Sequence, residues 1–276
     1  AQLGATATVP LTIFENDSSP STDNPIDNTT NFVRQHYHDF LNREPDAAGL
    51  AFWSNEIELC GADAQCREVK RINVSAAFFL SIEFQETGFL VHRAYRAAFN
   101  RLPRFREFLL DTQELGQGVA VGLPGWDTKL EQNKRAYFEE MVGRAPFAAL
   151  FGGMSNSQYV ETLNANAGGF LTPDERQALA AGLDNGQLTR AEVLRRIAEG
   201  AAFSAAETNR AFVLMQYFGY LRRDADAPDF RGIPDPNFDG YNFWLTKLNQ
   251  FGGNFVEAEM VKAFLISIEY RQRFGQ

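Results

Sequence analysis

The sequence predicts a mainly α-helical protein, a bundle of about four similar helical units preceded by one extended β-strand and a linker. Three observations lead to this prediction. Apolar residues recur every three or four positions over most of the chain from residue 30 onward, which is the spacing of amphipathic helices. A tyrosine motif recurs at intervals of roughly 60 residues, which indicates internal repetition. Residues 6–14 instead alternate apolar and other residues, which is the period of a strand.

The predicted strand stands alone in the sequence. Pro10 restricts it to the edge of a sheet, and nothing later in the chain alternates in a comparable way. Because one strand cannot satisfy its own backbone groups, we predict that residues 1–17 pair with another sheet. Residues 18–30 are rich in Asn, Asp, Ser, Thr and Pro and are predicted to form a flexible linker. The residues expected to act in assembly are those on one strand face, namely Val9, Leu11 and Ile13.

Helices are predicted for most of the remaining chain. A first helix, capped by Thr29 or Thr30, is expected to bury Phe32, Val33, Tyr37, Phe40 and Leu41. Further helices are predicted at 46–59, 64–86, 88–101, 127–142, 156–165, 173–183, 189–200, 205–222, 240–250 and 255–272, with the loops near 116–125 and 228–240 separating some of them. We assign helical units 1 and 2 to residues 31–152 and units 3 and 4 to residues 153–276.

Four copies of a motif mark the repeated units. The motif begins with a tyrosine and ends with an arginine, and a degenerate copy begins at Tyr159. Two further segments are duplicated near the two ends of the chain: a Gly-x-x-Phe-Trp run and a Ser-Ile-Glu run. We interpret the repeated Glu and Arg residues as links between helices rather than as acid and base catalysts, and the tryptophans as core rather than sugar-stacking residues. The motif residues are Tyr37, Arg43, Trp53, Glu83, Tyr95, Arg101, Tyr217, Arg223, Trp244 and Glu269.

At these residues the chain resembles the bacterial domain of unknown function 4214. The resemblance is carried by the start at 32–35, by the run from Phe40 to Trp53, and by the stretch from Leu188 to Phe203. It implies a helical fold similar to the phycobilisome linker domain, and a place in large surface or secreted proteins beside calcium-binding repeats or β-sandwich modules. It implies no catalytic residues. The segment from Ala7 to Asp17 resembles the last strand of a Calx-beta sandwich, whose remainder this sequence does not contain.

The two cysteines lie close together in the sequence. Cys60 and Cys66 are separated by a short, polar, flexible stretch that would let their Cβ atoms meet, so we predict a local disulfide. Closing so short a loop is worth about 2 kcal/mol. The alternative is a pair of unrelated thiols in a reducing compartment. Zinc is not expected, because it needs four ligands and the chain has no further cysteine.

Histidine and carboxylate positions were weighed as candidate metal sites. His36 and His38 are two residues apart on a predicted helix and point about 200° away from each other, so they cannot chelate one ion. We interpret these two and His92 as packing or exposed residues. Aspartates in the loop before residue 240 supply the oxygen ligands that calcium prefers, but their spacing is not that of an EF-hand. Calcium binding and solvated loops with helix caps remain alternatives for Asp226, Asp229, Asp235 and Asp239.

Charge and composition restrict the classes of function. A net charge of −9 repels nucleic acid and anionic lipid heads, no stretch approaches 18 apolar residues, and the N-terminus lacks a signal-peptide pattern. We therefore expect a soluble, processed chain that does not insert into membranes. The predicted function is a non-catalytic structural module, extracellular or at the cell surface, for assembly or adhesion. Its expected partners are its own copies, joined by strand donation, or a neighbouring β-sandwich domain. The alternative is a calcium- or carbohydrate-binding module that contacts surface polysaccharide; no other cofactor is expected.

Overall fold

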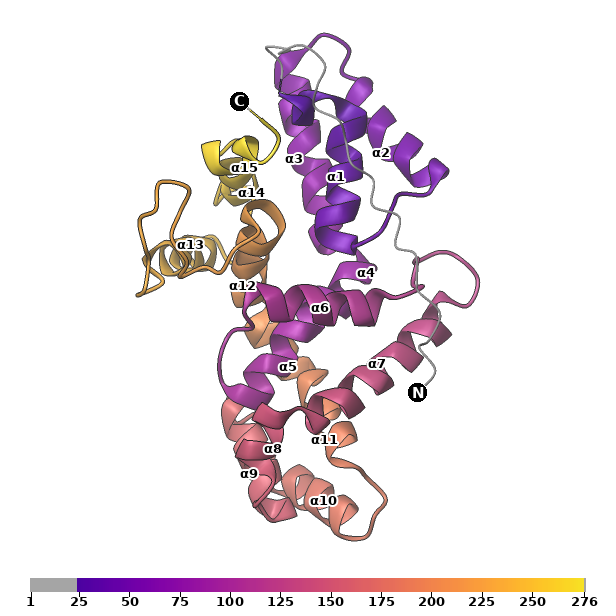
Figure 1. The fold of residues 1–276 in the computed structure, drawn as a ribbon, viewed down its shortest axis with the longest axis vertical. Helices are drawn as coiled ribbons and strands as arrows, with labels where there is room; N and C mark the ends of the chain where they lie inside the picture. The colour runs from indigo at the N-terminus through magenta and orange to yellow at the C-terminus, as the bar shows by residue number, and fades with distance from the viewer. Residues whose placement is uncertain (1–23, 276) are drawn as a thin grey trace, which may run out of the picture.

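The structure, a computed structural model, describes residues 24–275, and this part of the chain is mainly helical (Figure 1). Within it the only β-type pairing is an isolated bridge between Arg273 and Gly275, so no strand forms there. The strand predicted at residues 6–14 lies outside the described residues.

The helices follow one another with short connections. The first half contains η1 (Pro25–Asp27), α1 (Thr29–Leu41), α2 (Ala47–Glu58), α3 (Ala64–Leu80), α4 (Ile82–Phe84), the π-helical turn η2 (Gln85–Phe89), α5 (Leu90–Phe99), α6 (Phe105–Gly116), α7 (Trp126–Gly143) and α8 (Ala145–Phe151). The second half contains α9 (Asn156–Asn166), α10 (Pro173–Asp184), α11 (Arg190–Ala198), α12 (Ala201–Gln216), the π-helical turn η3 (Tyr217–Leu221), α13 (Asp239–Gln250), α14 (Met260–Leu265) and α15 (Ile268–Gln272).

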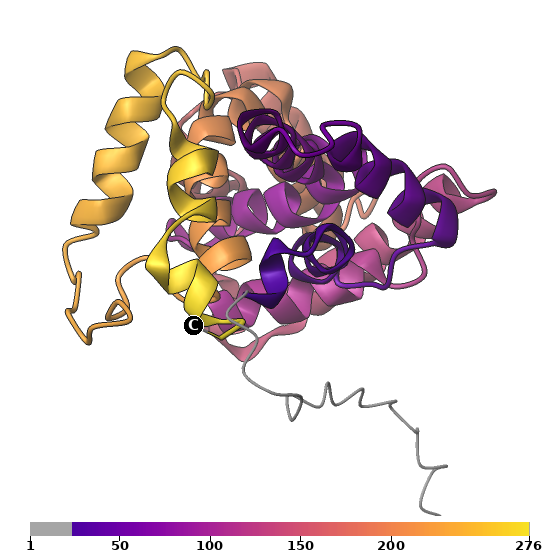
Figure 2. The same ribbon diagram turned by 90° about the horizontal axis from the view of Figure 1, so that it is seen from above.

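Two central helices connect the ends of an elongated body. In Figure 1, α1, α2 and α3 occupy one end and α8, α9 and α10 the other, while α5 and α12 run between them. α5 contacts α9, α11 and α12, so helices of the predicted halves 31–152 and 153–276 interleave. α13 stands at the margin of the body when it is viewed from above (Figure 2).

Two helices are absent from the sequence prediction, and two predicted helices are divided: the stretch predicted at 64–86 is interrupted at Ser81 between α3 and α4. α6 and α8 were not predicted, and the stretch predicted at 255–272 forms the shorter helices α14 and α15. Among residues 24–275, no single helix is long and apolar enough to span a membrane; only α3 together with residues 82–99, bent by 46°, meets that test.

The second part of the predicted linker is folded, which corrects the prediction of flexibility for residues 24–30. Asn24 is buried, and its side-chain amide donates to the carbonyls of Arg271 and Gly275, each at 2.9 Å. Ile26 joins the hydrophobic core from η1. The linker composition concealed these anchors because a single Ile among Asn and Asp residues gives no periodic signal.

The first and last parts of the chain meet at a close seam. The rings of Phe40 in α1 and Tyr220 in η3 lie 5.6 Å apart, and both residues are buried. A Cβ atom on Gly219 would overlap the ring of Phe40, so glycine is required for this approach. α3 also contacts α14 across the same seam.

A buried hydrogen-bond chain crosses the seam. His36 is fully buried; its Nδ1 lies 2.8 Å from the carbonyl oxygen of Phe32, and its Nε2 lies 2.7 Å from Ser75 Oγ. Ser75 in turn hydrogen-bonds the hydroxyl of Tyr220. Nδ1 donates to this carbonyl, and because the ring is neutral near pH 7 its Nε2 accepts from the Ser75 hydroxyl. Burial lowers the pKa of His36 to about 4, against the opposing effects of the Phe32 carbonyl and Asp39.

We predict that Gly219→Ala destabilises the protein by about 1–3 kcal/mol, because the added methyl group overpacks the seam against Phe40. The matched control is Gly143→Ala, since an added Cβ at Gly143, in the last turn of α7, meets nothing within 4 Å. Urea unfolding should show a lower midpoint for the first variant and an unchanged or higher midpoint for the second. Equal midpoints would contradict the close packing at the seam.

We also predict that acid weakens the fold through His36. The unfolded chain binds a proton at this histidine below about pH 6.5, whereas the folded chain does so only near its lowered pKa of about 4. The free energy of unfolding therefore falls as the pH drops through this window, by about 2 kcal/mol at pH 5 from this group. His36→Gln should be less stable at pH 7 but lose less stability between pH 7 and pH 5. An identical loss in both proteins, measured by urea unfolding, would refute the assignment.

Candidate functional site

The first candidate site is a cluster of Tyr37, Arg43 and Glu83, called here the first clasp. Arg43 joins the end of α1 to α4 through two hydrogen bonds to the Glu83 carboxylate, at 2.8 and 3.0 Å. Its guanidinium lies 5.0 Å from the centre of the Tyr37 ring. Although burial opposes it, the bonds to Glu83 raise the pKa of Arg43. The charge of the arginine is therefore fixed by its structural partner.

The last part of the chain repeats this arrangement in a second clasp of Tyr217, Arg223 and Glu269. Arg223 donates to the two carboxylate oxygens of Glu269 at 2.5 and 3.1 Å, and its guanidinium lies 5.4 Å from the Tyr217 ring centre. The serine before each glutamate motif plays the same part, because Ser81 and Ser267 each accept from a backbone N–H at 3.1 Å to cap a helix. The predicted Glu–Arg links between helices are present in both copies.

The duplicated glycine and tryptophan complete each clasp. Trp53 packs with its ring 6.0 Å from Phe78, and Trp244 packs 5.5 Å from Phe264. Both tryptophans are half-buried against the core rather than fully exposed. A Cβ atom on Gly240 would come within 2.7 Å of the Tyr217 hydroxyl, and one on Gly49 would overlap that of Tyr37. The conserved geometry of the two copies therefore depends on glycine at both positions.

The two middle copies of the motif are tied differently. Arg101 lies over Tyr95 at 5.1 Å but pairs with Glu107, the nearest carboxylate of α6, at 2.7 Å. At the degenerate copy, Arg190 lies over the Tyr159 ring at 4.9 Å and donates to backbone carbonyls. Sequence reasoning missed Arg190 because it lies in another helix, outside the motif.

The four aspartates considered for calcium do not come together. Asp226 pairs with Arg104 at 2.6 Å, and Asp229 pairs with Arg231 at 2.6 Å. Asp235 accepts from the backbone N–H groups of Asp239 and Gly240, at 2.7 and 2.8 Å, at the start of α13. In residues 24–275 no group of three or more His, Cys, Asp or Glu side chains is placed to hold a metal ion. For the aspartates described above, the structure agrees with the interpretation as helix caps and loop residues, and it does not bring them together as calcium ligands.

A groove next to the first clasp was not predicted. A hollow of about 560 Å³ lies between the end of α1 and the loop after α6, and a second of about 230 Å³ lies between α1, α3 and that loop. They share Leu41 and Arg43, so we treat them as one feature, the 117–123 groove. Its lining includes Leu41, Arg43, Trp53, Ile82, Gln117 and Leu123. The sequence predicts a loop near 116–125, but no pattern in it indicates which helices that loop contacts.

A third hollow, of about 440 Å³, lies between the start of α6 and the loop before α13. Its three guanidinium groups already lie beside carboxylates: Arg101 with Glu107 and Arg104 with Asp226, each within 2.7 Å, and Arg96 with Glu207 at 3.4 Å. A ligand anion would have to displace these carboxylates, so the hollow is less suited to anions than its arginines suggest.

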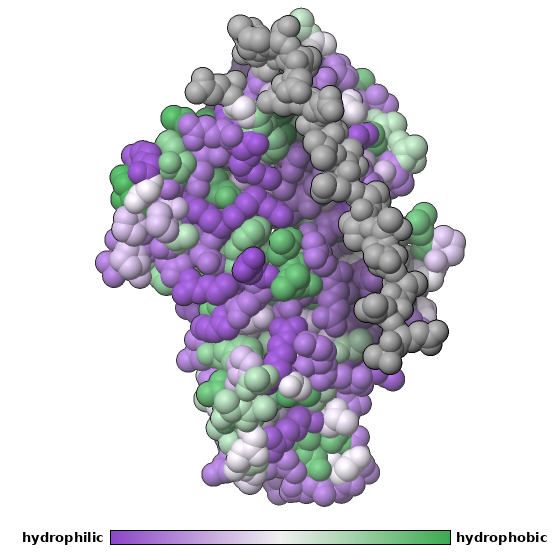
Figure 3. Space-filling view, in the orientation of Figure 1, coloured by the Kyte–Doolittle hydropathy of each residue, from purple (hydrophilic) through white to green (hydrophobic). Residues whose placement is uncertain are grey.

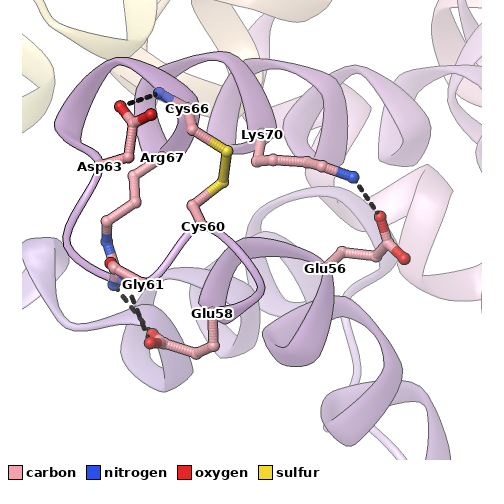
Figure 4. The surroundings of a disulfide bond; sticks show 8 residues. All are labelled: Glu56, Glu58, Cys60, Gly61, Asp63, Cys66, Arg67 and Lys70. Atoms are coloured by element: carbon pink, nitrogen blue, oxygen red, sulfur yellow. Dashed lines mark hydrogen bonds and ion pairs between the residues drawn. A yellow bond between two sulfur atoms is a disulfide. The ribbon is translucent and has the colours of Figure 1, made fainter.

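The turn between α2 and α3 carries the disulfide. Cys60 and Cys66 are bonded, with their Cα atoms 5.5 Å apart (Figure 4). Arg67 donates to both oxygens of Glu58 at 2.9 Å, and hydrogen bonds from Arg67 and Thr29 lower the pKa of Glu58 to about 2. Asp63 caps α3 by accepting from the Cys66 N–H at 3.0 Å. Several contacts therefore hold this turn beside the disulfide.

We predict that Cys60→Ser combined with Cys66→Ser lowers the free energy of unfolding by about 2 kcal/mol or less, because the closed loop is short. The remaining contacts of Arg67 and Asp63 should keep α2 and α3 in place. Thermal unfolding with and without a thiol reductant checks this: the wild type should shift on reduction and the double variant should not. A loss of the helical circular dichroism signal in the variant would contradict a merely local role.

Comparison with known proteins identifies one part of the chain. Residues 18–88 match the family model described as "Domain of unknown function (DUF4214)". The match covers η1, α1 to α4 and therefore the whole first clasp. Comparison with curated proteins and with solved structures gave no match. Residues 18–88 thus form a segment similar to the DUF4214 domain, about a quarter of the chain.

Proposed function

We propose that this protein is a non-catalytic structural module, secreted or displayed at the cell surface, that works in assembly or adhesion. We further propose that it is built from four related helical units, and that the segment before residue 18 pairs with a neighbouring sandwich domain or with another copy. This proposal includes the linker-like fold and the Calx-beta resemblance suggested by the sequence.

The observation that carries the proposal is a set of exposed apolar residues repeated at equivalent positions. Phe52 is 56% exposed and its counterpart Phe243 is 59% exposed. Leu80 and Ile266 precede the two serine caps and are 50% and 55% exposed. A single exposed apolar side chain is ordinary, but equal exposure in two copies favours use as contact surface.

The hydrogen bonds of the charged motif residues give further support. Arg43 and Arg223 donate to Glu83 and Glu269 respectively, so these carboxylates act as structural links. General acid or base catalysis needs a group that can exchange its proton with a substrate. A framework of fixed ion pairs with apolar outer positions suits a binding or assembly module better than an enzyme.

The disulfide and the surface charge fit the proposed location. Disulfides persist in oxidising compartments, and the Cys60–Cys66 bond lies in an exposed turn. The net charge of −9 favours solubility and disfavours nucleic acid as a partner. Hydrophobic residues nevertheless gather on the face shown in Figure 3, over α6, where Leu110 is exposed.

A carbohydrate-binding module is the second candidate, favoured by the outer face of α13. Phe243 and Phe251 flank a shallow hollow of about 660 Å³ whose lining includes Asn242, Thr246 and Gln250. Aromatic rings beside amides and hydroxyls are a common arrangement for holding sugars. Binding to a glycan array that is lost in Phe243→Ser would favour this candidate over self-assembly.

We predict that the full chain forms species whose mass grows with protein concentration, and that deletion of residues 1–17 lowers this mass. The combined change Phe52→Ser and Phe243→Ser should also lower it, because both rings are exposed and not needed for the core. Light scattering and negative-stain imaging under native conditions measure both effects.

Leu150→Ser is the control, since this leucine of α8 is 52% exposed but lies outside the duplicated segments. It should assemble like the wild type. A full chain that stays monomeric at every concentration and binds no glycan would overturn the proposed function.

A further inference from the structure

The 117–123 groove has the form of a binding site for a short extended segment. Its two hollows adjoin through Leu41 and Arg43 and open to solvent beside two exposed apolar side chains. Ile82 is 56% exposed at one hollow and Leu123 is 58% exposed at the other. Apolar side chains spaced along a groove can receive alternate side chains of an extended peptide.

The electrostatics of the groove favour an uncharged occupant. Arg43 and Glu83 neutralise each other through their paired hydrogen bonds. The other two carboxylates of the lining are also engaged: Glu44 lies 2.8 Å from His38 Nε2, and Asp46 accepts from the Gly49 N–H at 2.8 Å. Glu83 also accepts from the backbone N–H of Val121 at 3.3 Å, which ties the loop to α4. Inserting a charged side chain here would mean competing with a half-buried ion pair, whereas an apolar side chain would not.

The groove also offers partners for a peptide backbone. Gln113 and Gln117 line the larger hollow and their side chains are exposed. Each amide carries donors and an acceptor, so the pair can satisfy N–H and C=O groups of an extended chain. Such partners are required because an extended segment cannot satisfy its own backbone.

We propose that the 117–123 groove is the acceptor for residues 9–14, supplied by a second copy of the chain. This segment, Val-Pro-Leu-Thr-Ile-Phe, is uncharged and alternates apolar residues over its first five positions. It would dock by side-chain pockets and amide contacts, since residues 24–275 contain no sheet edge for it to join. The inference rests on the proposed assembly function and names the contact that performs it.

The length of chain before the folded body permits this contact. Asn24 is anchored near the start of α1, and nine residues lie between it and Phe14. The ten steps from Phe14 to Asn24 span at most about 36 Å and on average roughly 17 Å. The helix α1 is about 20 Å long. The segment can therefore leave its own body. Its own groove is also within reach and competes, which makes assembly depend on concentration, as in domain exchange.

The test measures binding of a synthetic peptide of residues 6–17 to protein that lacks residues 1–17. We expect saturable binding by fluorescence anisotropy, and at least roughly tenfold weaker binding by Ile82→Asp and by Leu123→Asp, which corresponds to about 1.4 kcal/mol. The matched control is Ile268→Asp, because Ile268 is the duplicate of Ile82, is 62% exposed, and lies outside the groove. It should bind the peptide like the parent protein.

A peptide with Leu11→Asp should fail to bind, and thermal unfolding should confirm that each protein variant is folded. Absence of peptide binding, or equal weakening in Ile82→Asp and Ile268→Asp, overturns the inference. Assembly of the full chain without peptide binding would leave the proposed function standing while this acceptor fails. Peptide binding to the shortened protein together with a full chain that never assembles would mean that no second copy supplies the segment, which overturns the inference and the assembly function together.

Discussion

The fold depends on the contact between Phe40 and Gly219, because it closes the first part of the chain on the last. The ring can lie against η3 only where the backbone has no Cβ, and Tyr220 then packs beside it. The hydroxyl of Tyr220 hydrogen-bonds Ser75, and Ser75 hydrogen-bonds His36, so these three buried polar groups from both parts satisfy one another. Without this closure the last part of the chain, which supplies the partners of Asn24 and packs α14 against α3, would have no fixed position against the first part.

Much of the helical fold could be predicted because apolar residues recur at the helical period. The elements that were missed are those whose helix caps or tertiary anchors do not appear in that pattern. α6 is absent from the prediction because its N-cap residue is Arg104 rather than Ser, Thr, Asp or Asn. Its first backbone N–H groups instead donate to Glu107 and to the distant Asp224. α8 was not predicted because it has only seven residues, with a proline near its start, and so short a helix shows no clear apolar periodicity. The folded end of the predicted linker was missed because its partners, Arg271 and Gly275, lie at the other end of the sequence.

The candidate site divides in the same way. Motif repetition was enough to predict Glu–Arg links between helices, since the same residues recur at matching positions and symmetric packing is the simplest cause. The pairing of Arg43 with Glu83 is seen only in the structure. The four aspartates considered for calcium do not come together in the structure. Composition shows that these carboxylates are present but not which group each one bonds. Asp226 accepts hydrogen bonds from Arg104, more than a hundred residues away in the sequence, while Asp235 accepts from the backbone at the start of the next helix. Those choices depend on tertiary geometry that spacing does not encode.

The difference between the two clasps explains why only the first lies in the 117–123 groove. Arg43 and Arg223 each donate to the carbonyl of the following residue, so the helical frames coincide to the level of single hydrogen bonds. Beyond that point the loops diverge: Val121 from a distant loop bonds Glu83, whereas Arg223 bonds the nearby carbonyl of Ala227. Loops carried on a repeated scaffold are where binding specificity can differ between copies. The duplication therefore supplies two rigid frames, and the 117–123 loop makes one of them an acceptor.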